Sequence, residues 1–324
     1  MLKTPFRFPF IALVCVCFLS FLTSCDLDEN ISFLEETRTG YLFYQDSEGE
    51  KGIALITKDA IQLQWNEGVG ITGSSLSDVS GFQKELWIAS ELDKTLYEID
   101  VLSGTVNKTI ELTDIAPTYI SVGEDEILIS DTSQNLAFFL NKRTERISQA
   151  PLPAKAGIST YKSRKFYLQS GTAPLLILQE DALAEITRFQ LERPISEIQA
   201  TPGVSVVVST QDSGNFEAEV NYNTNDLSRI EREVAYTKIR LSPFTRQLYG
   251  KEQLQTFTLT ENLLQPVNQS EVEDFEIDFF ENHLWLLRNG NLSQILPDGS
   301  TALNISCEGC SLMKSYFFQD FVGD

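Results

Sequence analysis

The sequence predicts an all-β fold, and three observations support this prediction. From Gly40 onward, short runs rich in Val, Ile, Leu, Phe, Tyr and Trp are separated by turn residues every eight to twelve positions. These runs have the length of strands, and no stretch shows a sustained helical period with caps at its ends. The runs also recur in groups of four, so the chain repeats a unit of roughly 40 residues.

The clearest repeat unit lies between residues 76 and 112. A first strand is expected at 76–81, a second at 86–90, a third at 95–100 and a fourth at 106–112. Equivalent second strands begin at Leu86, Ile127 and Phe166, with spacings of 41 and 39 residues. Four antiparallel strands in roughly 40 residues are typical of a β-propeller blade, in which twisted sheets pack face to face around a ring.

This unit resembles the repeats of the YVTN or YncE-like propellers. Those repeats combine a strand of the type LYVAN, a strand that ends in Ile-Asp, and a Ser-Gly or Thr-Gly turn. The corresponding residues here are Leu86-Trp87-Ile88-Ala89-Ser90, Ile99-Asp100 and Ser103-Gly104. In the next unit Phe138-Phe139-Leu140-Asn141 replaces the Ile-Asp pair. Some YncE-like surface lipoproteins capture corrinoids for a partner transporter, so the resemblance implies nutrient capture as one role.

We expect six blades, near residues 40–65, 76–112, 116–150, 156–191, 194–258 and 270–305. Seven blades are the alternative, because the stretch 194–269 is long enough to contain another one. The first blade lacks its innermost strand, and the run from Met313 to Val322 is left over at the other end. Both sheets would otherwise keep unpaired edges, so we expect the C-terminal strand to complete the first blade and close the ring.

The N-terminal segment resembles a bacterial lipoprotein signal. Lys3 and Arg7 precede an apolar run of about fifteen residues, from Phe8 to Leu22. Leu22-Thr23-Ser24-Cys25 has the pattern of a lipobox. The resemblance implies that residues 1–24 are removed and that Cys25 carries the lipid. Residues 25–39 would then form an acidic and polar tether to a propeller domain at 40–324. We expect an outer-membrane lipoprotein that faces the cell surface or the periplasm; an uncleaved membrane anchor is the alternative.

Charge limits the partners that this chain can have. Removal of residues 1–24, which include Lys3 and Arg7, would leave 23 basic residues against 46 acidic ones. Such a surface repels phosphate backbones and anionic headgroups, so we expect no nucleic-acid partner and membrane contact through the lipid alone. The charge either maintains solubility or attracts a cationic partner.

Cys307 and Cys310 are the pair of cysteines that follows Cys25. A single C-x-x-C cannot complete a four-cysteine zinc site, and His283 is the one histidine of the chain. We expect a small disulfide here, with a redox motif as the alternative. We predict no metal ion and no other cofactor.

A polar stretch, Gln211 to Ala235, breaks the repeat between two expected strands. We interpret it as an inserted loop on the propeller face that commonly binds ligands, with a solvated surface excursion as the alternative. Its acidic and amide side chains lack the spacing of a calcium loop. The candidate ligand-binding residues are Asp212, Asn215, Phe216, Glu217, Glu219, Tyr222 and Asp226.

A second acidic run extends from Glu271 to Glu281. Apolar residues alternate with it, so Glu276 and Asp278 share one face of a strand. If this strand is the innermost of the last blade, both carboxylates approach the central channel; a solvated edge is the alternative. His283 begins the next strand and is either a structural histidine or a third channel residue. Paired carboxylates can hydrolyse glycosides, but this requires a separation in space that a sequence does not show. The chain has no G-x-S-x-G elbow, which argues against a Ser-His-Asp triad with His283. We assign no catalytic residue.

We therefore expect a lipid-anchored envelope propeller that binds a small molecule or a partner protein, such as a transporter, without catalysis. A propeller enzyme, either a lyase or a glycan hydrolase, and a structural scaffold of an envelope complex are the alternatives. An enzyme would bring His283 and the acidic runs to one mouth of the channel. A scaffold would present a large exposed apolar patch.

Overall fold

A computed structural model describes residues 40–57, 59–150, 156–172, 174–180, 184–192, 194–200, 205–210, 216–229, 239–241, 247–250, 255–258, 264–266, 272–278, 283–296 and 298–317. They belong to one compact unit, Thr39–Gln319, and contain seven four-stranded antiparallel sheets. No helix in these ranges has the length and apolar character that a membrane crossing requires. The predicted signal peptide and tether lie outside the described residues.

We number the sheets as blades 1 to 7 and give the strands of each from the innermost outward. Blade 1 contains β28 (Ser311–Phe317), β1 (Gly40–Gln45), β2 (Lys51–Ile56) and β3 (Ile61–Gln62). Blade 2 contains β4 (Leu76–Phe82), β5 (Glu85–Ser90), β6 (Thr95–Asp100) and β7 (Thr105–Glu111). Two short helices, α3 (Trp65–Gly68) and η1 (Gly73–Ser75), connect these two blades.

The next two blades keep the same meander order. Blade 3 contains β8 (Tyr119–Val122), β9 (Glu126–Asp131), β10 (Leu136–Asn141) and β11 (Ile147–Gln149). Blade 4 contains β12 (Ala156–Lys162), β13 (Lys165–Ser170), β14 (Pro174–Gln179) and β15 (Glu185–Gln190).

Three further blades follow. Blade 5 contains β16 (Ile195–Ala200), β17 (Ser205–Thr210), β18 (Phe216–Asn221) and β19 (Leu227–Arg229). Blade 6 contains β20 (Ile239–Leu241), β21 (Gln247–Gly250), β22 (Gln255–Thr258) and β23 (Leu264–Pro266). Blade 7 contains β24 (Asp274–Asp278), β25 (His283–Arg288), β26 (Asn291–Ile295) and β27 (Thr301–Ser306).

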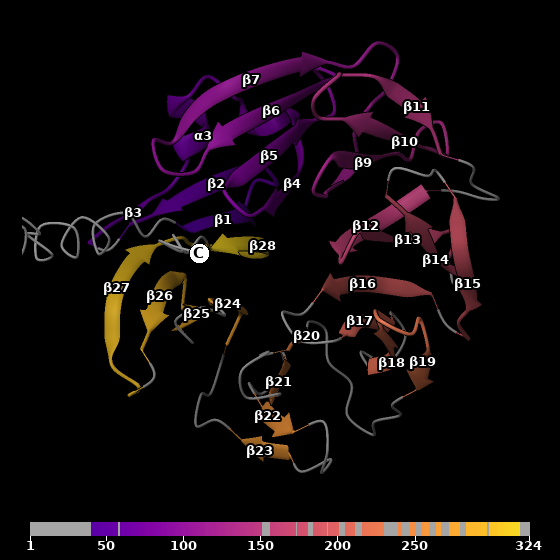
Figure 1. Ribbon diagram of the computed structural model, residues 1–324. Helices are drawn as coiled ribbons and strands as arrows, with labels where there is room; N and C mark the ends of the chain where they lie inside the picture. Colours follow the sequence, from indigo (N-terminus) through magenta and orange to yellow (C-terminus); the bar gives the residue numbers. More distant parts are fainter. Residues whose placement is uncertain are drawn as a thin grey trace, which may run out of the picture. The chain divides into compact units, whose positions relative to one another are not determined.

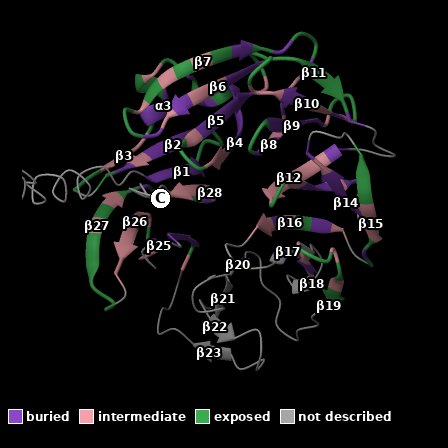
Figure 2. Cartoon of the chain, in the orientation of Figure 1, coloured by how far each residue is buried: buried purple, intermediate pink, exposed green. Residues whose placement is uncertain are grey.

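The core lies between neighbouring blades. Tyr41 and Ile53 of blade 1 join Leu86 and Ile88 of blade 2 in one apolar cluster, and similar clusters join blades 2 and 3, 3 and 4, 4 and 5, and 7 and 1. Inner strands are mostly buried, whereas the outer strands β7, β15 and β27 alternate exposed and partly buried residues (Figure 2). This pattern follows because the two faces of an inner strand both meet neighbouring sheets, whereas an outer strand meets solvent.

The predicted ring closure is confirmed. The yellow C-terminal strand β28 lies beside the indigo strand β1 (Figure 1), and the antiparallel register pairs Gly40 with Phe317 and Gln45 with Ser311. Blade 1 therefore takes its innermost strand from one end of the fold and its other strands from the opposite end. This pairing covers the edge that β1 would otherwise leave open.

The predicted number of six blades is wrong, and the alternative of seven is what the structure has. The stretch assigned to one blade, 194–258, contains blade 5 and most of blade 6. The reading of 211–235 as an inserted loop is also wrong. Phe216–Asn221 and Leu227–Arg229 pair in register as the third and fourth strands of blade 5.

A turn of common design joins the third and fourth strands in blades 2, 3 and 5. Each turn begins with Asp100, Asn141 or Asn221, whose side-chain oxygen accepts hydrogen bonds from backbone amides two or three residues later. Each ends in a left-handed residue whose amide bonds back to the first carbonyl; these residues are Gly104, Glu145 and Asn225. The repeat is therefore marked by a turn geometry that several sequences can satisfy.

Candidate functional site

A buried ion cluster connects the inner strands of four blades. Arg240 on β20 of blade 6 forms ion pairs with Glu276 on β24 of blade 7, at 2.6 Å, and with Glu197 on β16 of blade 5. A second hydrogen bond, 2.9 Å long, runs from Nε of Arg240 to Glu276. Ser315 on β28 of blade 1 also donates to Glu276, at 3.0 Å. Glu276 is thus buried on an inner strand as a partner of Arg240.

Electrostatics keeps Arg240 charged inside the protein. Burial by itself lowers the pKa of Arg240, but the negative charges of Glu197 and Glu276 outweigh burial and raise its pKa above the ordinary arginine value. A buried charge is tolerated when it is both paired and hydrogen-bonded. The cluster therefore holds blades 5, 6, 7 and 1 together.

Other polar contacts continue between the inner strands of the remaining blades. Lys314 on β28 forms a 2.6 Å ion pair with Asp78 on β4. The other oxygen of Asp78 accepts a 2.9 Å hydrogen bond from the amide of Ile120 on β8. Asp274 on β24 accepts a 2.8 Å hydrogen bond from the amide of Leu312. These contacts join the inner strands of neighbouring blades, so they fix the blades relative to one another.

Asp278 and His283 lie side by side at one end of blade 7. They are opposite each other in the register of β24 and β25. Nδ1 of His283 lies 2.9 Å from the side-chain nitrogen of Gln294 on β26. The sequence analysis grouped Glu276, Asp278 and His283 as channel candidates. The structure places Glu276 against Arg240 and places Asp278 beside His283.

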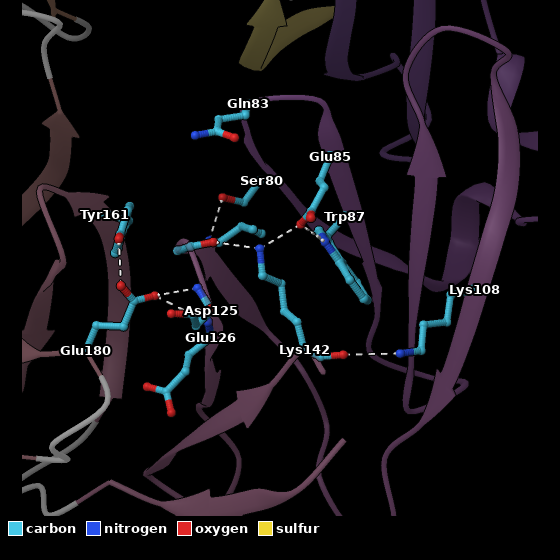
Figure 3. Close-up of polar contacts among 12 residues, drawn as sticks. Ser80, Gln83, Glu85, Trp87, Lys108, Asp125, Glu126, Lys142, Tyr161 and Glu180 are labelled. Atoms are coloured by element: carbon cyan, nitrogen blue, oxygen red, sulfur yellow. Dashed lines mark hydrogen bonds and ion pairs between the residues drawn. The ribbon is translucent and has the colours of Figure 1, made fainter. Parts of the chain in front are cut away.

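A second set of polar contacts stabilises the seams between blades 2, 3 and 4 (Figure 3). Nζ of Lys142 forms a 2.7 Å ion pair with Glu85 and donates to the carbonyl of Gly123 at 2.9 Å. Glu85 also accepts a 3.3 Å hydrogen bond from the indole of Trp87. Lys142 thus carries its charge across the seam between blades 2 and 3.

Glu180 performs the same role between blades 3 and 4 (Figure 3). Its side chain is 1% exposed and accepts hydrogen bonds from the amides of Asp125 and Glu126, at 2.9 and 3.2 Å. The hydroxyl of Tyr161 donates to it at 2.7 Å. Burial, together with this hydrogen bond to Glu180, raises the pKa of Tyr161, so the tyrosine stays a neutral donor.

An open pocket of about 340 Å³ lies between blades 1 and 2. Three segments line it: residues 48–51 in the turn from β1 to β2, residues 73–76 around η1, and residues 91–92 in the turn from β5 to β6. Gly73 permits the close approach of η1 to β2, because a Cβ atom there would lie 2.4 Å from the carbonyl oxygen of Lys51. The pocket was not predicted from the sequence, because its residues lie in turns of two blades and form no recognisable motif.

The carboxylates of this pocket differ from those at the seams between blades, because no cation of the described residues is paired with them. Glu48 and Glu50 are exposed and Glu91 is partly buried. In the described part of the chain, none of the three has an ion-pair partner; Glu91 accepts a long hydrogen bond, 3.4 Å, from Thr118. Lys51 lines the same pocket, but its Nζ donates to the carbonyl of Ser77 at 3.2 Å. With three glutamates and one lysine, the lining carries a net charge of -2.

The pocket opens at the end of β1 that is opposite Gly40. β1 runs from Gly40 to Gln45, and the residues that follow it line the pocket. The polypeptide before Gly40 therefore joins at the opposite end of this strand, about 17 Å away at 3.4 Å per residue. Phe317, which pairs with Gly40, lies at that opposite end too.

The other predicted site residues are placed as follows. Cys307 and Cys310 form a disulfide in the connection between β27 and β28, and Cys307 is buried in the cluster of blades 7 and 1. Asp212 and Asn215 lie outside the described residues, as does Cys25. Phe216, Glu217 and Glu219 lie on β18, and Tyr222 and Asp226 lie in the turn that follows it. In the described ranges, no group of three His, Cys, Asp or Glu side chains is arranged to hold a metal ion.

Comparisons with known proteins agree on the fold. A candidate 6-phosphogluconolactonase from Bacteroides uniformis matches with a TM-score of 0.60 and 13% identity, over 87% of this chain and 100% of its own. Hydrazine synthase of Kuenenia stuttgartiensis matches with a TM-score of 0.52 and 7% identity, over 77% and 96%. The β-propeller domain of Cps50 (Swd1) from Myceliophteria thermophila matches with a TM-score of 0.51 and 13% identity, over 72% and 87%.

These likenesses show an all-β propeller built of four-stranded sheets. At identities of 7–13% they concern the fold alone, because propellers of one architecture serve unrelated functions. A scan of protein-family models finds no match, and a search of curated sequences finds no significant relative. The function therefore has to be argued from the residues of this chain.

Proposed function

We propose that this protein is a lipid-anchored propeller of the bacterial cell envelope that binds a ligand or a partner protein without catalysis. The binding site is the pocket between blades 1 and 2. The observation that carries the proposal is a pocket whose lining holds three carboxylates without an ion-pair partner among the described residues, Glu48, Glu50 and Glu91, whereas Asp78, Glu85 and Glu276 are paired across seams. Carboxylates that no cation of the fold neutralises can pair with a ligand in a pocket, whereas the paired ones stabilise the fold.

Position supports the same function. The lipobox pattern predicts attachment through Cys25, and the chain enters the propeller at Gly40, at the end of β1 opposite the pocket. Attachment at that end leaves the pocket clear of the point where the tether joins the propeller. Such a pocket is open to a nutrient that is passed to an envelope transporter, or to the transporter itself.

The attachment is tested by the variant Cys25→Ser. The full chain should fractionate with membranes and release from them on loss of the acyl chain, and the variant should be found in the soluble fraction. Membrane retention of the variant would indicate the uncleaved anchor instead.

The site is tested by filling the pocket. Ser74 is exposed and lines it, so Ser74→Trp occupies its volume, whereas Thr109→Trp places the same side chain on the exposed outer strand β7. The full chain and both variants are purified in detergent from the native envelope, and co-purifying small molecules and proteins are identified by mass spectrometry. We expect one compound or protein to be retained by the native chain and Thr109→Trp but lost from Ser74→Trp. Identical retention by both variants would place the site elsewhere.

A further inference from the structure

We infer that the pocket between blades 1 and 2 binds a ligand through an alkylammonium or guanidinium group next to an aliphatic segment. This inference rests on the proposed function, because it assigns the chemistry of that site. The group belongs either to a free organic amine or to a basic side chain of a partner protein, and the test separates the two.

The charges that line the pocket favour a cationic ligand over an anionic one. Glu48 and Glu50 project from the turn between β1 and β2, and Glu91 approaches from the turn between β5 and β6. Two walls of the pocket thus carry carboxylates, and Lys51 offsets one of the three charges. An anion would meet a net charge of -2, whereas a cation can contact carboxylates from both turns. Carboxylates that accept hydrogen bonds from a charged donor make stronger contacts than neutral pairs do.

Leu92 is the reason to expect an aliphatic segment in the ligand. It lines the pocket and is 72% exposed, the highest exposure among the large apolar side chains of the described residues. Exposed leucines are common singly, but this one lines the same pocket as the three carboxylates. The stems of lysine and arginine pack on apolar surface while their charged ends remain with polar partners. A ligand with an amine on a short aliphatic chain satisfies both the leucine and the glutamates.

The strength of such a contact is modest and depends on salt. Each exposed charge pair contributes little on its own, so replacing three glutamates by glutamine should weaken binding about tenfold. Salt screens exposed charges, so affinity should fall between low and physiological ionic strength. A ligand held by apolar contact alone would show neither effect.

The experiment measures binding to the full chain in detergent by isothermal titration calorimetry. The free-amine probe is agmatine, and the partner probe is a capped peptide with one arginine flanked by leucines. Butanediol is the neutral control and glutarate is the anionic one. The variant combines Glu48→Gln, Glu50→Gln and Glu91→Gln. Its matched control makes the same change in charge on three exposed residues that lie in connections between strands, outside the pocket: Asp59→Asn, Asp114→Asn and Glu124→Gln.

We expect at least one cationic probe to bind the native chain and the matched control equally, and to bind the glutamine variant about tenfold more weakly. Preference for agmatine would identify a free amine as the ligand, and preference for the peptide would identify a partner's basic side chain. Equal binding to the glutamine variant, no binding of either cation, or tighter binding of glutarate would overturn the inference. If the cations fail while Ser74→Trp still loses a neutral or anionic compound, the proposed binding site stands and its cationic chemistry is wrong. If Ser74→Trp loses nothing, both fail.

Discussion

Replacement of Arg240 by methionine should lower the free energy of unfolding by about 3–5 kcal/mol. Arg240 is 5% exposed and Glu276 is 1% exposed, so the substitution leaves a buried carboxylate without the guanidinium that neutralises it. Two hydrogen bonds, of 2.6 and 2.9 Å, disappear with the charge. Methionine is close to arginine in length and apolar, so the cost comes from the stranded charge rather than from a cavity.

Loss of Arg240 should affect its two partners, Glu197 and Glu276, unequally, because they differ in exposure. The side chain of Glu197 is 30% exposed, so water can replace Arg240 there, and we expect Glu197→Gln to cost about 1 kcal/mol or less. Glu276 has no such access. Arg240→Met combined with Glu276→Leu removes both buried charges, and the double variant should recover most of the stability lost by Arg240→Met.

Urea unfolding followed by tryptophan fluorescence measures these differences. Trp285 on β25 is the register partner of Glu276, so it reports on the blade that receives the perturbation. The native chain, Arg240→Met, Glu276→Leu and the double variant form one thermodynamic cycle, and Glu197→Gln is measured beside it. The reasoning is refuted if Arg240→Met unfolds within about 1 kcal/mol of the native chain, or if the double variant is no more stable than Arg240→Met.

Three further predictions concern the seams, acid stability and the disulfide. Glu180→Ala leaves the part-buried amide of Asp125 and the buried amide of Glu126 without this acceptor and should cost about 2–4 kcal/mol in urea unfolding. Glu180→Gln keeps an acceptor and should cost clearly less; equal costs would contradict the role of the oxygen atoms of Glu180. Burial by itself raises the pKa of Asp131, but the hydrogen bonds that its carboxylate accepts outweigh burial and lower this pKa in the folded protein. The ionised carboxylate therefore stabilises the fold above the unfolded pKa of about 4, and this stabilisation is lost as pH falls through the folded pKa. The stability difference between the native chain and Asp131→Asn should therefore shrink from pH 6 to pH 3, and a constant difference would show that ionisation is irrelevant. Combined Cys307→Ser and Cys310→Ser should cost about 2 kcal/mol, the loop-closure value for a four-residue loop, and a reductant should lower the native melting temperature but leave that of the variant unchanged.

The fold was predictable where each strand keeps a strong apolar signal. Second strands begin at Glu85, Glu126 and Lys165, within one residue of the expected positions, because their apolar runs are buried on both faces. Blade 5 was missed because β18 alternates Phe216, Ala218 and Val220 with glutamates, so its composition suggests a polar loop. The available signal for blade 5 was Asn221, which begins a turn of the same hydrogen bonding as the turn at Asp100. The signal was missed because this turn lacks the Ser-Gly sequence.

The ion cluster and the pocket could not be derived from sequence for a different reason. Arg240 stands between Ile239 and Leu241 in a short strand, and nothing local indicates that its partners are 43 and 36 residues away, on blades 5 and 7. Alternation did place Glu276 and Asp278 on one face of β24, but it could not show what faced them. The pocket combines two turns and a short helix from two blades, and such a concavity exists only after the blades pack.

Ring closure by β28 also makes the order of synthesis matter. Among the described strands β1 is synthesised first and β28 last, so the sheet of β1 lacks its innermost strand until β28 is made. Contacts this distant in sequence carry a high cost of loop closure and form late in folding. A copy interrupted before Ser311 would lack Lys314 and Ser315, which contact Asp78 and Glu276, and would keep an open strand edge that invites aggregation. We therefore expect chains that end before β28 to be less stable than chains made through to Phe317.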